Sequence, residues 1–303
     1  MLDSDWDGKS KKRLMPKALA LRIIDECAAI GAPALKFNFR GESVIHPDYG
    51  EIVGYARGKI HDPEGWARRG CAASLRAGEY KFHDLLANTN GNIPPALWES
   101  SIRGLMACTK VMVSLDSMDP AIYPKVRVGL SLESAQKTIS ELVKRGHPGL
   151  WVRRVVCKDN KDEDFARAVY ARWPSGVRVS EHYAFDRNHY QQQELGVEDH
   201  SKWERQFCGY PSQRVVIEAS GSYSPCCISW EGEFYKTGLP GRYPEMGIME
   251  YWNSAWRKQL VSELRQNIFT NDKCKNCTTF MAFRRPEREF VKDVEVVEVS
   301  EKA

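Results

Sequence analysis

Residues 131–156, SLESAQKTISELVKRGHPGLWVRRVV, contain a helix pattern followed directly by a strand pattern. Ser131 is placed to cap a helix over 131–146, and Gly146 is placed to end it. The run LWVRRVV at 150–156 then predicts a strand. A helix that leads into a strand after so short a turn is the repeating unit of a parallel sheet.

The same alternation extends to both sides of this stretch. Further strand patterns cover residues 35–39, 82–89, 110–117 and 177–183, and further helix patterns cover 16–31, 47–59, 94–108 and 163–173. This repetition predicts a parallel sheet wrapped by helices, either an open doubly wound sheet or a full or partial barrel. We therefore expect one α/β domain over residues 1–186.

The character of the chain changes after residue 186. Residues 187–206 are polar and predict a linker, and RVVIEASGSYSPCCIS (214–229) predicts a β-hairpin that turns at Gly221 and Ser222. The run IMEYWNSAWRKQLVSELRQ (248–266) predicts one amphipathic helix, which the CKNC motif follows closely. We expect a small α+β domain over 207–286, and a charged tail with a short strand over 287–303.

Composition narrows the class of protein. The chain has 303 residues, 42% of them hydrophobic, and a mean hydropathy of −0.50, which suits a protein with a sizeable core. No apolar run is long enough to cross a bilayer and no apolar segment follows Met1, so we expect a cytoplasmic protein without a membrane partner. The net charge of +4 is mild, and nucleic acid is therefore not indicated as a partner.

The cysteines are distributed unevenly along the chain. Four of them stand alone and are interpreted as small buried apolar residues: Cys27, Cys71, Cys108 and Cys157. The other five lie in the last third: Cys208, Cys226, Cys227, Cys274 and Cys277. Nine cysteines in a reducing compartment argue against a disulfide framework. Their grouping favours a metal site, because the C-x-x-C spacing lets two thiolates face one ion or cluster.

Four thiolates could converge in this region, from Cys208, Cys226, Cys274 and Cys277. Such a set suits either structural zinc or an iron–sulfur cluster. Cys226 and Cys227 cannot both point the same way along a strand, so we take Cys226 as the ligand and Cys227 as its substitute. Free cysteines in a small core and a redox-active C-x-x-C are the alternatives.

Polar residues follow three successive predicted strands. They are Gly41 and Glu42, then Asn90 and Gly91, then Ser114 and Asp116. A barrel-type sheet places its site at the carboxyl ends of its strands. There the Glu42 carboxylate could bind an ammonium group, and Ser114 and Asp116 could bind ribose hydroxyls. Each pair alone is an ordinary turn, but their succession predicts a binding site.

Taken together, these motifs resemble the radical S-adenosylmethionine (SAM) enzymes. The resemblance is carried by MPKALALRIIDECAAIGAPALKFNFRGESVIHPDY (15–49), NTNG (88–91) and VMVSLDSMDPAIYPKVRVG (111–129). Residues 207–277, from FCGYPSQ to CKNC, are similar to the SPASM/twitch domain attached to many of these enzymes. The resemblance implies a partial (β/α)6 barrel, bound SAM and an auxiliary 4Fe–4S cluster in the C-terminal domain.

The resemblance also assigns roles to individual residues. Glu42 matches the glutamate that takes the SAM ammonium, with Arg40 where many members have a first glycine. Ser114 and Asp116 match a polar pair after the family's fourth strand, and Arg127 matches an arginine near the SAM carboxylate. The remaining assignments are SAM contacts at Gly41 and Asn90, and cluster ligands at Cys208, Cys226, Cys274 and Cys277.

One departure from the family pattern concerns the catalytic cluster. The family holds that cluster on C-x-x-x-C-x-x-C after the first strand, and this sequence contains no such triplet. We therefore expect a radical-SAM-type barrel without its first strand, through truncation, a split gene or degeneration. A separate N-terminal fragment that carries the triplet is then an expected partner, and this chain alone is expected to be inactive.

For the intact enzyme, the resemblance implies an electron from an external donor, a 5′-deoxyadenosyl radical and hydrogen abstraction from a substrate, expected to be a peptide or protein. The alternative is a non-enzymatic binding module with structural zinc on the same four cysteines. Glu181 and His182, at the end of the last barrel strand, are either acid–base candidates or structural residues.

Overall fold

Five parallel strands organise the larger part of the protein. The computed structural model describes residues 14–38, 41–58, 82–183, 207–226, 241–270, 274–275, 277, 287–291 and 294–299. The chain divides into two units. The sheet unit comprises Ile23–Ala184, Gln193–Val197 and Arg285–Ala303, and the cysteine unit comprises Met1–Arg22, Phe185–Gln192 and Glu198–Arg284.

The parallel strands lie side by side in the order in which they occur in the chain. They are β1 (Ala34–Lys36), β2 (Asp84–Thr89), β3 (Lys110–Ser114), β4 (Leu150–Val156) and β5 (Arg178–Tyr183). Such a sequential order is typical of a barrel wall, whereas the strand order of a doubly wound sheet reverses at a switch point. The structure therefore confirms an α/β fold with a parallel sheet, and the strand order favours the barrel-type alternative.

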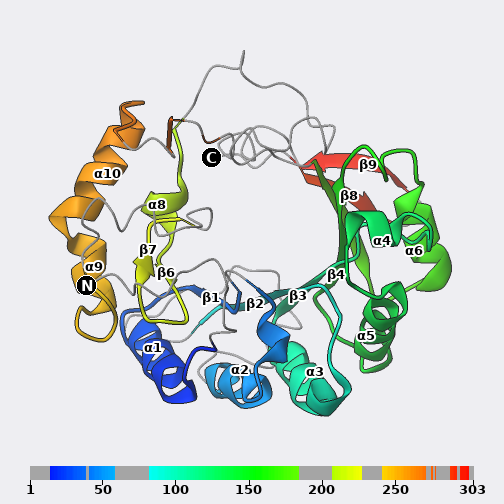
Figure 1. Ribbon diagram of the computed structural model, residues 1–303, viewed down its shortest axis with the longest axis horizontal. Coiled ribbons are helices and arrows are strands. Elements are labelled where there is room, and N and C mark those ends of the chain that lie inside the picture. Colours follow the sequence, from blue (N-terminus) through cyan, green and yellow to red (C-terminus); the bar gives the residue numbers. More distant parts are fainter. Residues whose placement is uncertain are drawn as a thin grey trace. The chain divides into compact units, whose positions relative to one another are not determined.

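One helix precedes β1, and the other helices and two 3-10 turns lie between the strands. They are α1 (Lys17–Ala29), α2 (Tyr49–Arg57), α3 (Trp98–Ala107), α4 (Tyr123–Val126), α5 (Leu132–Lys144) and α6 (Phe165–Arg172), with 3-10 turns η1 (Ser43–Ile45) and η2 (Pro95–Leu97). Figure 1 shows α2, α3 and α5 along the same side of β1–β4. On that side Val111, Val113 and Val152 pack with Ile102 of α3 and Ile139 of α5 in the main hydrophobic core.

The opposite face of the sheet is more polar. Alternate residues along a strand point to opposite faces, and residues in register on neighbouring strands share a face. Starting from Asn88 in β2, the paired positions on this face include Met112, Ser114, Trp151, Arg153, Ser180 and His182, with Leu86 and Val155 on the same face. A strand face with amides, hydroxyls and cations suits a ligand better than a second apolar layer.

Residues 131–156 form the predicted helix and the predicted strand. Helix α5 begins at Leu132, and its Ser131 cap accepts a hydrogen bond from the Ser134 N–H at 3.1 Å. The helix ends at Lys144, two residues before Gly146, and β4 covers Leu150–Val156. Local capping and periodicity were therefore sufficient signals here.

The cysteine unit contains a short hairpin and two consecutive helices. Its elements are α8 (Tyr210–Gln213), β6 (Val216–Ile217), β7 (Tyr223–Ser224), α9 (Ile248–Asn253) and α10 (Ala255–Arg265). Strands β6 and β7 are antiparallel and turn through Gly221, as predicted. The single helix predicted over 248–266 is wrong, because Ser254 leaves the helical conformation and caps α10 by accepting from the Arg257 N–H at 3.3 Å.

The end of the chain holds more strand than its sequence suggests. Residues 287–303 are predicted as a charged tail with a short strand, but β8 (Glu287–Val291) and β9 (Val294–Val299) form an antiparallel pair. Strand β8 pairs with β5 and so extends the parallel sheet. Edge pairing requires only backbone groups, which explains why charged residues did not prevent it.

No helix within the described parts of the chain is long and apolar enough to cross a membrane.

Candidate functional site

Glu42 lies six residues after the end of β1 and directly before the 3-10 turn η1. The chain reaches it through Gly41, whose φ of +72° is a conformation that glycine adopts without strain. Its Oε2 accepts a hydrogen bond from the Asn90 N–H at 2.7 Å. Its Oε1 is shielded from solvent and has no hydrogen-bond partner among the described residues. Burial raises the pKa of Glu42, while the Asn90 N–H and the charge of Arg127 oppose that rise.

The turn after β2 presents backbone rather than side chain to Glu42. The Asn90 side chain folds back and accepts from the Asn92 N–H at 2.8 Å, so its N–H is the group aimed at the carboxylate. Gly91 has φ +74°, and a Cβ there would lie 3.0 Å from the Ala135 Cα. The predicted turn is thus present, and it couples the loops after β1 and β2.

Ser114 and Asp116 do not share a strand. Strand β3 ends at Ser114, which is half-buried on the polar face of the sheet. Asp116 has φ +63°, so the chain turns and the two-residue spacing no longer places both side chains on one face. The Asp116 carboxylate accepts from the Val155 N–H at 2.8 Å and pairs with the Arg127 Nε at 2.7 Å. Burial raises the pKa of Asp116, and the charge of Arg127 opposes that effect.

The ion pair with Asp116 uses only part of the Arg127 guanidinium. The ion pair uses Nε, and a quarter of the arginine side chain is exposed. The charge of Arg127 also opposes the rise in pKa that burial causes at Glu42 and Tyr123, so these groups share one electrostatic environment. A carboxylate and a guanidinium in one such environment can recognise the ammonium and the carboxylate of an α-amino acid.

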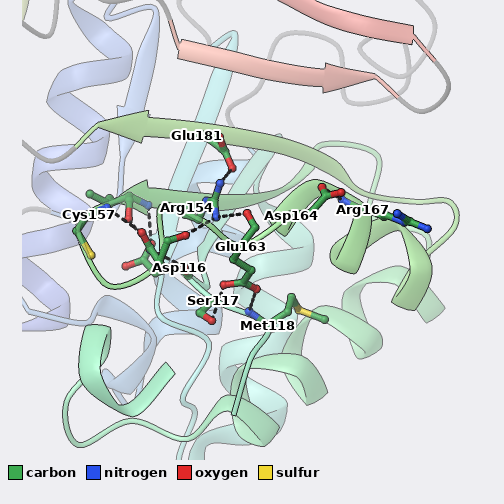
Figure 2. A network of polar contacts seen from close by, with 11 residues as sticks. Asp116, Ser117, Met118, Arg154, Cys157, Glu163, Asp164, Arg167 and Glu181 are labelled. Atoms are coloured by element: carbon green, nitrogen blue, oxygen red, sulfur yellow. Dashed lines mark hydrogen bonds and ion pairs between the residues drawn. The ribbon is translucent and has the colours of Figure 1, made fainter. Parts of the chain in front are cut away.

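A network of buried polar contacts fixes the loops beside Asp116 (Figure 2). Arg154 of β4 pairs with Glu181 of β5, and its Nη1 donates to the carbonyls of Asn160 and Glu163, both at 2.9 Å. The Glu163 carboxylate in turn accepts from the loop after β3. Glu181 is buried in an ion pair with Arg154, which favours the structural interpretation of this residue.

Two polar side chains near the strand ends were not singled out from the sequence. They carry buried oxygen atoms without a hydrogen-bond partner among the described residues: Asn38 Oδ1 and Asn88 Oδ1. Asn38 and Asn88 lie two residues beyond Lys36 and Leu86, which are in register, so the amides follow on one face. Buried polar atoms are normally paired, so unpaired ones at a strand end indicate a ligand site. Polar residues inside strand patterns were the available signal.

The predicted ligands in the cysteine unit come from separate segments that share one core. Cys208, Cys226 and Cys274 all pack against Leu260 and Leu264 of α10. These residues are not in disulfides. Four thiols, with Cys277 three residues after Cys274, are a donor set that fits an iron–sulfur cluster or zinc.

The thiols are gathered but not arranged as a coordination sphere. No group of three or more His, Cys, Asp or Glu side chains in the described ranges is placed so that it could hold a metal ion. The backbone N–H of Cys277 donates to the Cys274 carbonyl at 3.4 Å, which keeps the two cysteines of the motif on one turn. The fit to a cluster therefore rests on the chemistry and common location of the thiols.

The isolated cysteines behave largely as predicted. Cys27 and Cys108 are buried, and burial raises the pKa of each thiol to about 12, which makes both unreactive. Cys157 is half-buried in the loop after β4. The predictions for Arg40, Cys71, Cys227 and the linker 187–206 lie outside the described residues.

Comparison with known proteins identifies the C-terminal part. Residues 208–278 match the SPASM family, an iron–sulfur cluster-binding domain. The matched span contains all four predicted ligands. No curated protein sequence matches the chain.

Solved structures share the fold across most of the chain. Hexahistidine-tagged anSMEcpe with bound AdoMet (SAM) has a TM-score of 0.55 at 13% identity, over 88% of this chain and 75% of that chain. Native anSMEcpe with AdoMet and the Cp18Cys peptide has a TM-score of 0.52 at 14% identity, and with the Kp18Cys peptide 0.53 at 13%. Both comparisons cover 88% of this chain and 79% of that chain. The fold therefore matches that of radical SAM enzymes, and the predicted fold with a SPASM-type domain is confirmed.

Proposed function

We propose that this chain binds SAM at the carboxyl end of its parallel sheet and holds one 4Fe–4S cluster on Cys208, Cys226, Cys274 and Cys277. The observation that carries the proposal is the match of residues 208–278 to an iron–sulfur cluster-binding domain. The fold, which over 88% of the chain resembles structures with bound AdoMet, supports the SAM part.

The residues at the sheet edge fit the amino-acid end of SAM. The unpartnered Oε1 of Glu42 would accept the ammonium, and Arg127, positioned by Asp116, would bind the carboxylate. Gly41 keeps backbone close to the ligand, the Asn90 N–H holds Glu42 in place, and Ser114 is available to a ribose hydroxyl. In radical SAM enzymes, SAM supplies the species that abstracts hydrogen from the substrate.

A peptide or protein is the proposed substrate class. Two solved structures with the same fold hold peptides, Cp18Cys and Kp18Cys. Because the 303-residue sequence has no C-x-x-x-C-x-x-C triplet, we propose that a separate polypeptide with that triplet and an external electron donor complete the enzyme. Localisation in the cytoplasm stays a prediction.

Anaerobic reconstitution of the full chain tests both cofactors. We expect about four irons and four sulfides per chain, with an EPR signal on reduction. Calorimetry should show SAM binding, weakened roughly tenfold or more in Glu42→Gln, because a charge-assisted hydrogen bond contributes about 1.5–3 kcal/mol. Glu133→Gln is the control, since Glu133 is exposed on α5. We expect no 5′-deoxyadenosine from this chain alone.

The outcomes separate the parts of the proposal. If the reconstituted chain contains zinc and no iron, the four cysteines form a structural zinc site and the proposed cluster is wrong. Equal SAM affinity in wild type and Glu42→Gln would remove Glu42 from the site. Formation of 5′-deoxyadenosine by this chain alone would contradict the role given to the missing triplet.

A further inference from the structure

Two buried donor atoms in the cysteine unit, the Tyr251 hydroxyl and the Arg257 Nε, have no hydrogen-bond partner among the described residues. Tyr251 of α9 is 1% exposed, and its phenol oxygen has no hydrogen-bond partner among the described residues. Arg257 of α10 is 6% exposed, and its Nε is likewise unsatisfied within those residues. Leaving a buried polar group unpaired costs about 1–3 kcal/mol, so each calls for a partner.

The neighbouring tyrosine shows that packing alone does not require the Tyr251 hydroxyl. The rings of Tyr223 and Tyr251 stack with centroids 4.3 Å apart and planes inclined by 6°. The Tyr223 hydroxyl donates to the Met246 carbonyl at 2.8 Å, whereas that of Tyr251 has no such acceptor among the described residues. Phenylalanine would fill the position of Tyr251 without burying an unpaired hydroxyl.

Arg257 is a buried cation bonded to neutral groups. Its Nη1 donates to the Trp252 carbonyl at 2.8 Å, its Nη2 to the Pro211 carbonyl at 2.7 Å, and its guanidinium lies 3.3 Å from the Trp252 ring centroid. Within the described residues no carboxylate pairs with it. Burial lowers the pKa of Arg257, because removal from water disfavours the charged guanidinium. An anion at this place would offset that cost.

The predicted cluster ligands lie on the segments that hold these donors. Pro211, fixed by Arg257, comes three residues after Cys208, and Cys226 comes three residues after Tyr223. Helix α10, which carries Arg257, also carries the leucines against which three of the cysteines pack. Burial raises the pKa of the Tyr251 phenol, the charge of Arg257 opposes that rise, and Cys226 adds to it.

We propose that Tyr251 donates a hydrogen bond to the cluster-bound sulfur of Cys226 and that Arg257 provides the counter-charge, so that together they raise the reduction potential of the C-terminal cluster. The proposal rests on the cluster proposed above. A cluster with four thiolates is anionic and gains negative charge on reduction. Donors and cations near its sulfurs therefore stabilise the reduced state.

An EPR-monitored redox titration of the reconstituted full chain tests the proposal. Tyr251→Phe should favour the oxidised cluster about tenfold, which for a one-electron couple is ~59 mV towards more negative potential. Tyr223→Phe is the matched control, because it removes a buried hydroxyl from the same ring stack but one that bonds to a carbonyl. It should lower the melting temperature and leave the potential unchanged.

Arg257 needs a conservative variant, because its loss also releases two carbonyls. Arg257→Lys keeps the charge and should shift the potential less than Arg257→Gln, and iron content is measured for each variant. A potential that is the same in wild type and Tyr251→Phe, with equal iron content, overturns this inference alone. A wild-type chain that takes up no iron–sulfur cluster overturns the proposed function as well, and the iron count distinguishes the two results.

Discussion

His147 is held in one tautomer by two backbone groups of the sheet unit. Its Nδ1 accepts from the Gly149 N–H at 3.1 Å, so Nε2 carries the proton and faces the Cys108 carbonyl at 3.2 Å. Burial lowers the pKa of His147 below its ordinary 6.5, while the Cys108 carbonyl opposes the shift. Protonation of Nδ1 would break the bond from Gly149.

Protonation of His147 is expected to make the fold sensitive to acid. Because the folded pKa is depressed, the unfolded chain binds the proton first, and the free energy of unfolding should fall as pH decreases below about 6.5. Urea unfolding between pH 7.5 and 5.5 measures the slope. His147→Asn should be less stable at pH 7.5 but should have a shallower slope, and an unchanged slope would show that another group is responsible.

At the scale of elements, helices α2 and α3 pack closely through glycine. A Cβ at Gly104 in α3 would overlap the ring of Tyr49 in α2. Gly54, on the exposed side of α2, would meet no atom within 4 Å. The two glycines therefore serve different purposes, although both lie within helices.

Alanine at the two positions should have opposite effects on stability. Gly104→Ala should lower the free energy of unfolding by about 1–3 kcal/mol, because it overpacks a buried contact. Gly54→Ala should raise it by about 0.5–1 kcal/mol, because alanine favours the helix. Thermal or urea unfolding compares both with wild type, and a stabilising Gly104→Ala would contradict the close packing.

At the scale of the whole molecule, the cysteines divide into two groups. Cys27 and Cys108 are buried in the sheet unit, with thiols whose pKa burial raises to about 12. The four predicted ligands are half-buried. Burial thus separates Cys27 and Cys108 from the candidate ligands, whereas Cys157, which is outside the predicted ligand set, is half-buried as they are.

A serine scan should reproduce this division. Substitution of Cys208, Cys226, Cys274 or Cys277 should lower the iron content after reconstitution severalfold, because a four-thiolate site loses a ligand. Cys27→Ser and Cys108→Ser should keep the iron content and lose about 1–3 kcal/mol of stability, because each buries a hydroxyl. Loss of iron in Cys227→Ser but not in Cys226→Ser would exchange the roles of these neighbours.

The sequence alone determined the features that depend on short-range patterns. Periodicity and caps located the parallel strands and their helices, and the C-x-x-C spacing located the cysteine site. These signals act within a few residues, so they can be read locally. The same logic failed at Ser254, which interrupts a continuous amphipathic pattern, and at Asp116, where a positive φ ends the strand alternation.

Only the tertiary structure decided which polar groups are paired and which are left for a ligand. The Asp116 carboxylate accepts a hydrogen bond from the Val155 N–H, 39 residues away, and Arg257 donates to the Pro211 carbonyl, 46 residues away. The unpartnered oxygens of Glu42 and Tyr251 are likewise properties of the fold, since a partner is lacking only once all described neighbours are in place. Pairing of buried polar groups depends on segments that are distant in sequence, and no local pattern encodes it.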